Sequence, residues 1–88
     1  MIVIYSTGMC PYCVRAKRFL DTKGVSYTEL RVDLDPALRQ QMEHKSQRRS
    51  VPQIFIGDHH VGGFDDMWRL EQSGKLDTLL GGITLPSN

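Results

Sequence analysis

The sequence predicts an α/β fold with a four-stranded mixed sheet that carries helices on both faces. Short β-branched runs alternate with amphipathic stretches in the order β-α-β-α-β-β-α-α. Proline or aspartate stands where helices should begin and glycine where they should end. The 88 residues predict a single domain over 1–88, in which 83–88 form a frayed tail.

The first strand and helix follow from the N-terminal quarter of the chain. Ile2–Tyr5 is a short apolar run with β-branched residues on both faces, which predicts a buried strand. Pro11 suits the first position of a helix, because its missing N–H would be unpaired there in any case. Gly24 should end this helix. One stripe of the helix collects its apolar side chains except Val14, namely Cys13, Ala16, Phe19 and Leu20.

A second strand and helix follow. Tyr27–Val32 alternates as a strand should, and Asp35 followed by Pro36 is typical of a helix N-terminus. Leu38 and Met42 should form the inner face of that helix.

The last part of the chain predicts a hairpin and two helices. Gly57 and Asp58 form a turn signal between two strands, Gln53–Ile56 and His59–Val61. Asp65 or Asp66 should open a helix that closes at Gly74, and Lys75–Leu80 should form the final one. The first two strands should pair in parallel through a right-handed helical crossover, and the last two should pair antiparallel.

Charge and composition exclude several classes of function. The formal net charge is +1, which favours neither nucleic acid nor an acidic membrane as a partner. The first apolar run, Met1–Tyr5, is too short for a signal segment or a membrane span. We therefore expect a cytoplasmic monomer. Thiols are kept reduced in that compartment, which counts against a permanent disulfide.

The only two cysteines, Cys10 and Cys13, lie in the stretch "TGMCPYCVRAKRF" and allow three interpretations. A structural disulfide would close a ring of about four residues and remove only about 2 kcal/mol of unfolded-state entropy. A zinc site needs about four ligands. The histidines show no ligand spacing, so we expect no metal. These are His44, His59 and His60.

The third interpretation, a redox pair, is favoured because it uses the residues that are present. If Pro11 opens the helix, Cys10 lies at its N-terminus, where unpaired amides and the helix dipole favour a negative charge. Thiolate is the reactive form of cysteine, so we predict that Cys10 is the nucleophile. Cys13 lies one turn later on the stripe that faces the sheet, where it should be shielded and act as the resolving thiol.

Each of two further motifs allows two structural interpretations. In "SVPQIFI", Pro52 could mark an edge strand, or a cis Val51–Pro52 bond could turn the Val51 backbone outward to pair with an extended peptide. In "GGFDD", Gly62 and Gly63 could form a simple turn capped by aspartate. They could instead expose helix N–H groups that bind a carboxylate.

The order strand, CPYC, helix, SVPQIFI and GGFDD resembles the glutaredoxin family over Ile2–Leu80, most closely the small bacterial dithiol members. The resemblance implies a thioredoxin-like fold, a cis bond at Pro52, and glutathione as the thiol co-substrate. The chain has no flavin, nicotinamide or phosphate-binding glycine pattern, so we expect no tightly bound cofactor.

The resemblance also assigns residues. Cys10 would attack disulfides or glutathionylated cysteines and Cys13 would resolve the product. Arg39 would contact the glycine carboxylate of glutathione, with Arg48 and Arg49 as alternatives. The implied glutathione-binding residues are Tyr12, Arg39, Val51, Pro52, Gly63, Phe64 and Asp65. Among them, Tyr12 would flank the tripeptide, Val51 would pair with its cysteine backbone, and Asp65 would meet its α-ammonium group.

Two positions depart from the family pattern. Thr7 stands where many glutaredoxins have lysine, which should weaken electrostatic support for the thiolate and for the glutathione carboxylate. Phe64 stands where many members have a cysteine or a small residue. In having phenylalanine at this position, the chain is similar to the redoxins that serve ribonucleotide reductase and take electrons from thioredoxin reductase.

The expected function is a glutathione-dependent thiol–disulfide oxidoreductase. It would reduce protein disulfides and glutathione mixed disulfides, and glutathione reductase with NADPH would restore the glutathione. The alternatives are reduction by thioredoxin reductase, and an iron–sulfur cluster carrier that uses glutathione as a ligand.

Overall fold

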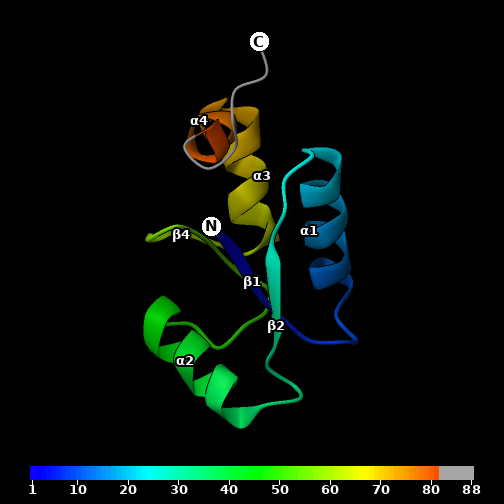
Figure 1. The fold of residues 1–88 in the computed structure, drawn as a ribbon, viewed down its shortest axis with the longest axis vertical. Helices are drawn as coiled ribbons and strands as arrows, with labels where there is room; N and C mark the ends of the chain where they lie inside the picture. The colour runs from blue at the N-terminus through cyan, green and yellow to red at the C-terminus, as the bar shows by residue number, and fades with distance from the viewer. Residues whose placement is uncertain (82–88) are drawn as a thin grey trace.

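The computed structural model describes residues 1–81, and the tail expected at 83–88 lies outside the described residues. The elements follow the predicted order: β1 (Ile2–Ser6), α1 (Pro11–Thr22), β2 (Thr28–Arg31), α2 (Pro36–Ser46), β3 (Gln53–Ile56), β4 (His59–Gly62), α3 (Phe64–Gln72) and α4 (Lys75–Gly81). Figure 1 shows this arrangement, with α2 below the sheet and with α3 and α4 above it.

The sheet has the strand order β2-β1-β3-β4. β1 pairs with β2 in parallel, and β3 pairs antiparallel with both β1 and β4. Both predicted pairings are therefore confirmed. Because β3 lies between two strands, an edge position does not explain Pro52, and the alternative is confirmed: the Val51–Pro52 bond is cis.

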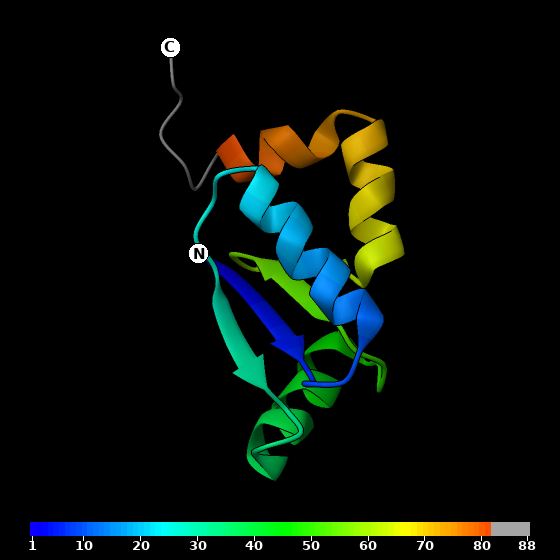
Figure 2. The same ribbon diagram turned by 90° about the vertical axis from the view of Figure 1, so that its right-hand side faces the viewer.

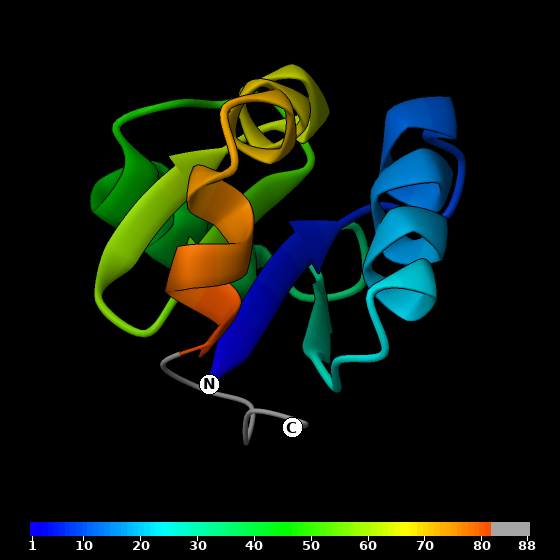
Figure 3. The same cartoon turned by 90° about the horizontal axis from the view of Figure 1, so that it is seen from above.

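The two faces of the sheet carry separate cores, because successive side chains of a strand point to opposite faces. Ile2 and Ile4 of β1 pack with buried residues of α1, α3 and α4. Val3 and Tyr5 pack on the other face, against Met42 of α2. Seen from above, α1 covers the β2 side of the sheet, whereas α3 and α4 cover the β4 side (Figure 3).

Helix α1 begins and ends as its sequence predicts. Pro11 is its first residue, and Gly24 follows the C-cap Lys23 with a φ of 72°, a conformation that glycine adopts without strain. Cys13, Ala16 and Leu20 are all fully buried. Figure 2 shows α1 crossing in front of the strands, with its first turn next to the loop that leaves β1.

Helix α3 begins earlier than predicted. The expectation that Asp65 or Asp66 opens it is wrong: its first residue is Phe64 and its N-cap is Gly63. The reason is that the Asp66 carboxylate accepts a hydrogen bond from the Gly63 N–H at 2.9 Å, which places Asp66 in the third helical position. β4 correspondingly runs one residue further than expected, to Gly62.

Replacing Gly62 with alanine should destabilise the protein by about 2–3 kcal/mol. Gly62 has a φ of 110°, which strains an L-residue, and a Cβ there would lie 2.8 Å from Cγ of Asp66. The free energy of unfolding in urea measures the loss. Gly81→Ala is the matched control, because a Cβ at Gly81 meets no atom within 4 Å. An equal loss in both variants would contradict this explanation.

Candidate active site

The loop after β1 delivers Cys10 to the N-terminus of α1, where it is the N-cap residue. Its sulfur accepts a hydrogen bond from the Cys13 N–H at 3.4 Å, which is the contact that an N-cap side chain makes. The Cys10 thiol also lies 3.8 Å from the carbonyl oxygen of Val51. Cys10 is partly exposed and free of any disulfide. It can therefore be reached by a substrate.

Cys13 lies one turn further along α1 and is fully buried. The pKa of the Cys13 thiol is raised to about 11, mainly by burial and also by contact with Cys10, whereas the Thr7 N–H and Lys17 oppose the rise. The two sulfurs thus occupy unlike surroundings. One is accessible and contacts a helix N–H, and the other is a protonated thiol at neutral pH.

The raised pKa of Cys13 predicts that the reduced protein loses stability in alkali. The unfolded thiol ionises near 9.0 and the folded one near 11, so the unfolded state releases its proton first. The stabilising contribution is complete below about pH 9 and is lost as the pH rises to 11, by about 3 kcal/mol at most. Denaturant unfolding of reduced wild type and Cys13→Ala across this range measures it. A constant difference between the two proteins would contradict the assignment.

A cavity of about 300 Å³ opens beside Cys10. The residues that line it come from the turn after Cys10, the segment before β3 and the start of α3: Tyr12, Arg48, Ser50, Val51, Pro52, Gly63, Phe64, Asp65 and Asp66. The structure therefore gathers six of the seven expected glutathione-binding residues around one cavity. The exception is Arg39.

Arg39 lies outside this cavity. Its guanidinium donates to the carbonyl oxygen of Arg49 at 3.3 Å and lies 3.9 Å from Glu43. Arg48, which the sequence offered as an alternative, lines the cavity instead.

The backbone N–H and carbonyl groups of Val51 form no hydrogen bond with the described strands of the sheet. Among the described residues its N–H has no hydrogen-bond partner, and its carbonyl oxygen contacts only the Cys10 thiol. An extended peptide lying along Val51 could therefore form main-chain hydrogen bonds next to the Cys10 sulfur.

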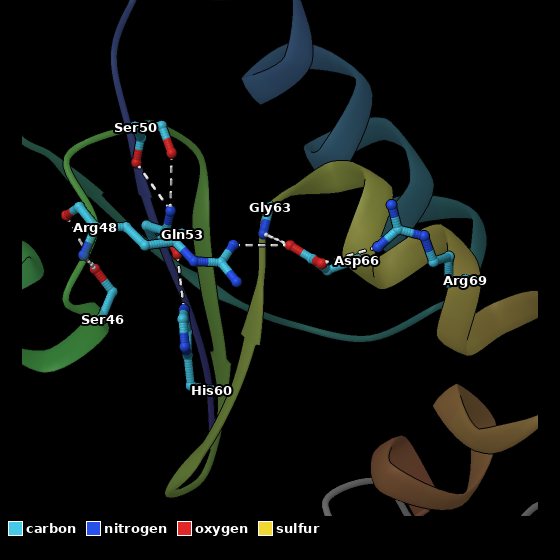
Figure 4. A network of polar contacts seen from close by, with 8 residues as sticks. All are labelled: Ser46, Arg48, Ser50, Gln53, His60, Gly63, Asp66 and Arg69. Carbon is cyan, nitrogen blue, oxygen red and sulfur yellow. Dashed lines mark hydrogen bonds and ion pairs between the residues drawn. The ribbon is translucent and has the colours of Figure 1, made fainter.

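An ion pair joins the two sides of the cavity (Figure 4). Arg48 donates to the Asp66 carboxylate at 2.9 Å, and Arg69 donates to its other oxygen at 3.2 Å. The hydrogen bond from the Gly63 N–H, followed by the one from Arg48, lowers the pKa of Asp66. Asp66 therefore stays ionised while it fixes the first turn of α3 and holds the segment that contains Arg48.

A second set of contacts fixes the segment that precedes β3. The amide of Gln53, which is fully buried, donates to the carbonyl oxygen of Ser50 at 3.0 Å and accepts from the His60 ring at 2.7 Å. Desolvation lowers the pKa of His60, with a further contribution from Arg48, so its ring is mainly neutral near pH 7. Side chains of β3 and β4 thereby hold the Ser50 side of the cavity in place (Figure 4).

Sequence reasoning missed Ser50 and Asp66 as cavity residues. Asp66 had a signal, because an acidic residue three positions after a helix N-cap is typical of a capping box. Ser50 carries no such pattern.

Within residues 1–81, no group of three histidine, cysteine or acidic side chains could hold a metal ion. No helix among these residues is long and apolar enough to cross a membrane.

Comparison with known proteins yields consistent matches. The family model named Glutaredoxin matches residues 2–61. A glutaredoxin of Pseudomonas aeruginosa is 52% identical over 79 residues, which cover 90% of this chain and 94% of that protein. Glutaredoxin 3 of Escherichia coli is 49% identical over 79 residues, with 90% and 95% covered.

Solved structures agree with the sequence comparison. The solution structure of a Brucella melitensis glutaredoxin superimposes with a TM-score of 0.81 at 47% identity and covers 97% of this chain and 92% of its own. A crystal structure of a buckwheat glutaredoxin–glutathione complex has a TM-score of 0.85 at 31% identity, with 92% and 76% covered. The described architecture is thus the thioredoxin-like fold that the sequence predicts.

Proposed function

The chain belongs to the glutaredoxin family and is a thiol–disulfide oxidoreductase, and we propose that glutathione is its reductant. The observation that carries this proposal is the cavity beside Cys10, which combines a free peptide backbone at Val51 with a helix N-terminus at Gly63. Glutathione has the matching features, since it is a short extended peptide with a carboxylate at each end. The relative from buckwheat is described as a complex with glutathione.

The proposed reaction starts at Cys10. Its thiolate attacks one sulfur of a substrate disulfide and expels the other as a thiolate, which leaves a mixed disulfide on Cys10. Either a glutathione thiolate or Cys13 then attacks the Cys10 sulfur. In the second case the Cys10–Cys13 disulfide is reduced by two molecules of glutathione, and glutathione reductase with NADPH restores the glutathione.

The proposed binding mode of glutathione is based on the residues that line the cavity. The cysteine portion of glutathione pairs with the Val51 backbone, and Pro52 and Tyr12 flank it. The γ-glutamyl carboxylate lies at the first N–H groups of α3, at Phe64 and Asp65, because helix N-termini favour anions. The Asp65 carboxylate accepts from the α-ammonium group.

The glycine carboxylate requires a cation, and three arginines lie in this part of the chain. Arg48 is best placed, because it lines the cavity and Arg39 does not. We therefore assign the main contact to Arg48 and a peripheral one to Arg39. Thr7 provides no positive charge beside Cys10.

The experiment that tests this proposal compares two reducing systems. Reduction of a glutathionylated peptide and of a protein disulfide is followed by NADPH oxidation, once with glutathione and glutathione reductase and once with thioredoxin reductase. We expect turnover with the first system and little with the second. The reverse result would assign the chain to the redoxins that thioredoxin reductase serves, and would contradict glutathione as the reductant. Glutathionylated proteins and protein disulfides of the cytoplasm are the proposed substrates.

A further inference from the structure

A polar cluster lies at the point where β1, β2 and α1 meet, on the inner side of the active-site helix. The Glu29 carboxylate of β2 accepts from Ser6 Oγ at 2.5 Å and from Lys17 Nζ at 2.8 Å, through the same oxygen. Ser6 is fully buried, and the side chains of Lys17 and Glu29 are 28% and 29% exposed. We refer to Ser6, Lys17 and Glu29 as the Lys17 cluster. Neither the cavity nor the attack by Cys10 uses it.

Two members of the Lys17 cluster, Lys17 and Ser6, lie close to Cys13 in the structure. Lys17 follows Cys13 by four residues on α1, so their side chains share one face of the helix. Ser6 precedes Thr7, whose N–H donates a hydrogen bond to the Cys13 sulfur. The ammonium group of Lys17 acts electrostatically on this thiol and favours its ionised form. The ion pair with Glu29 at 2.8 Å holds that ammonium group on the Cys13 side of the helix.

The chemistry of the resolving step explains why such a cluster matters. Cys13 must lose its proton before it can attack, yet its burial raises its pKa to about 11. A positive charge held near the sulfur increases the small fraction of thiolate at neutral pH. Cys10, as the N-cap residue, obtains its support from the helix N-terminus and does not need this charge.

We propose that Lys17, held in place by Glu29 and Ser6, is a positioning residue that promotes the attack of Cys13 on the mixed disulfide. The inference rests on the proposed roles of Cys10 and Cys13. In this step the Cys13 thiol gives its proton to water and its thiolate forms a bond to the Cys10 sulfur. The bond between Cys10 and the substrate sulfur breaks, and the substrate leaves as a thiolate that takes up a proton. The two cysteines are oxidised by two electrons, and the substrate disulfide has been reduced by two.

Other charged groups surround the cluster. Cys10 and Lys17 are the titratable groups that the structure shows acting on Cys13. Asp21 of α1, Lys17 and Glu29 all act on Tyr27, and Arg31 of β2 acts on Glu29. Hydrogen bonds from Lys17 and then Ser6 lower the pKa of Glu29, so it stays a carboxylate throughout the neutral range. The Glu29 carboxylate therefore stays available as the partner of Lys17.

An aromatic disulfide, 4,4′-dithiodipyridine, separates the two steps in one stopped-flow experiment. Attack by Cys10 releases the first coloured thiopyridone, and attack by Cys13 on the resulting mixed disulfide releases the second. In Lys17→Met we expect an unchanged first phase and a second phase about 3- to 10-fold slower at pH 7. The difference should narrow as the pH rises toward the pKa of Cys13. Lys17→Arg should restore the second phase.

Arg18→Met is the matched control, because Arg18 is an exposed cation on the same helix and its loss changes the net charge equally. It should leave both phases unchanged. A wild-type second phase in Lys17→Met would overturn the inference. So would a second phase slowed by the same factor at every pH, or slowed equally in Lys17→Arg, since either would indicate a purely structural role. Failure of the wild-type first phase would instead overturn the proposed role of Cys10.

Discussion

Replacing Cys10 with serine should reduce the activity on glutathionylated and disulfide substrates to the uncatalysed level, a loss of at least about 10³-fold. Cys10 is the accessible sulfur at the N-terminus of α1 and the one that contacts Val51 at the edge of the cavity. Serine keeps the N-cap hydrogen bond but provides a hydroxyl that cannot attack a disulfide at neutral pH. The NADPH-linked reduction of a glutathionylated peptide measures the loss.

The folded state of Cys10→Ser provides the control for this experiment. Its free energy of unfolding in urea should lie within about 1 kcal/mol of reduced wild type, since serine is a good N-cap residue. A folded Cys10→Ser protein that retains wild-type activity would contradict the assignment of the nucleophile.

Replacing Cys13 with serine should separate the two activities. Removal of glutathione from a peptide needs only Cys10 and an incoming glutathione thiol, so its rate should stay within about 3-fold of wild type. Reduction of a protein disulfide through the Cys10–Cys13 disulfide should fall by at least about 10²-fold, because the buried resolving thiol is absent. The same two substrates, assayed side by side, provide the measurement.

Equal losses on both substrates would contradict this division of roles. They would mean that the Cys13 side chain also supports the first attack, for example through its hydrogen bond with the Cys10 side chain. Cys13→Ala is a useful second variant, because it leaves the backbone N–H in place and removes every polar atom of the side chain.

The sequence predicted the order, the type and most boundaries of the elements because each carries a local signal. Pro11 and Asp35 mark helix N-termini, and Gly57 with Asp58 marks the hairpin. These signals depend on neighbours within a few residues, which the sequence displays directly. The predicted hairpin and the parallel pair followed from the same signals and general rules of connection.

The parts that the sequence could not predict depend on contacts between distant segments. The start of α3 was placed too late, because the Asp66 carboxylate caps Gly63 and also binds Arg48, 18 residues away. The same ion pair places Arg48 on the cavity, while the contact with Arg49 keeps Arg39 off it. Lys17 and Glu29 lie 12 residues apart, and the parallel pairing of β1 and β2 brings Glu29 beside Ser6, where Lys17 of α1 reaches it.

The measurement that tests the central claim most directly is the rate of alkylation of each cysteine in the reduced protein at pH 7. A limiting amount of iodoacetamide and peptide mass spectrometry assign the modification to a residue. We predict that Cys10 is modified at least about 10²-fold faster than Cys13, because one sulfur is accessible and supported by a helix N-terminus while the other is fully buried and protonated. Equal rates for the two cysteines, or a faster reaction of Cys13, would contradict the account.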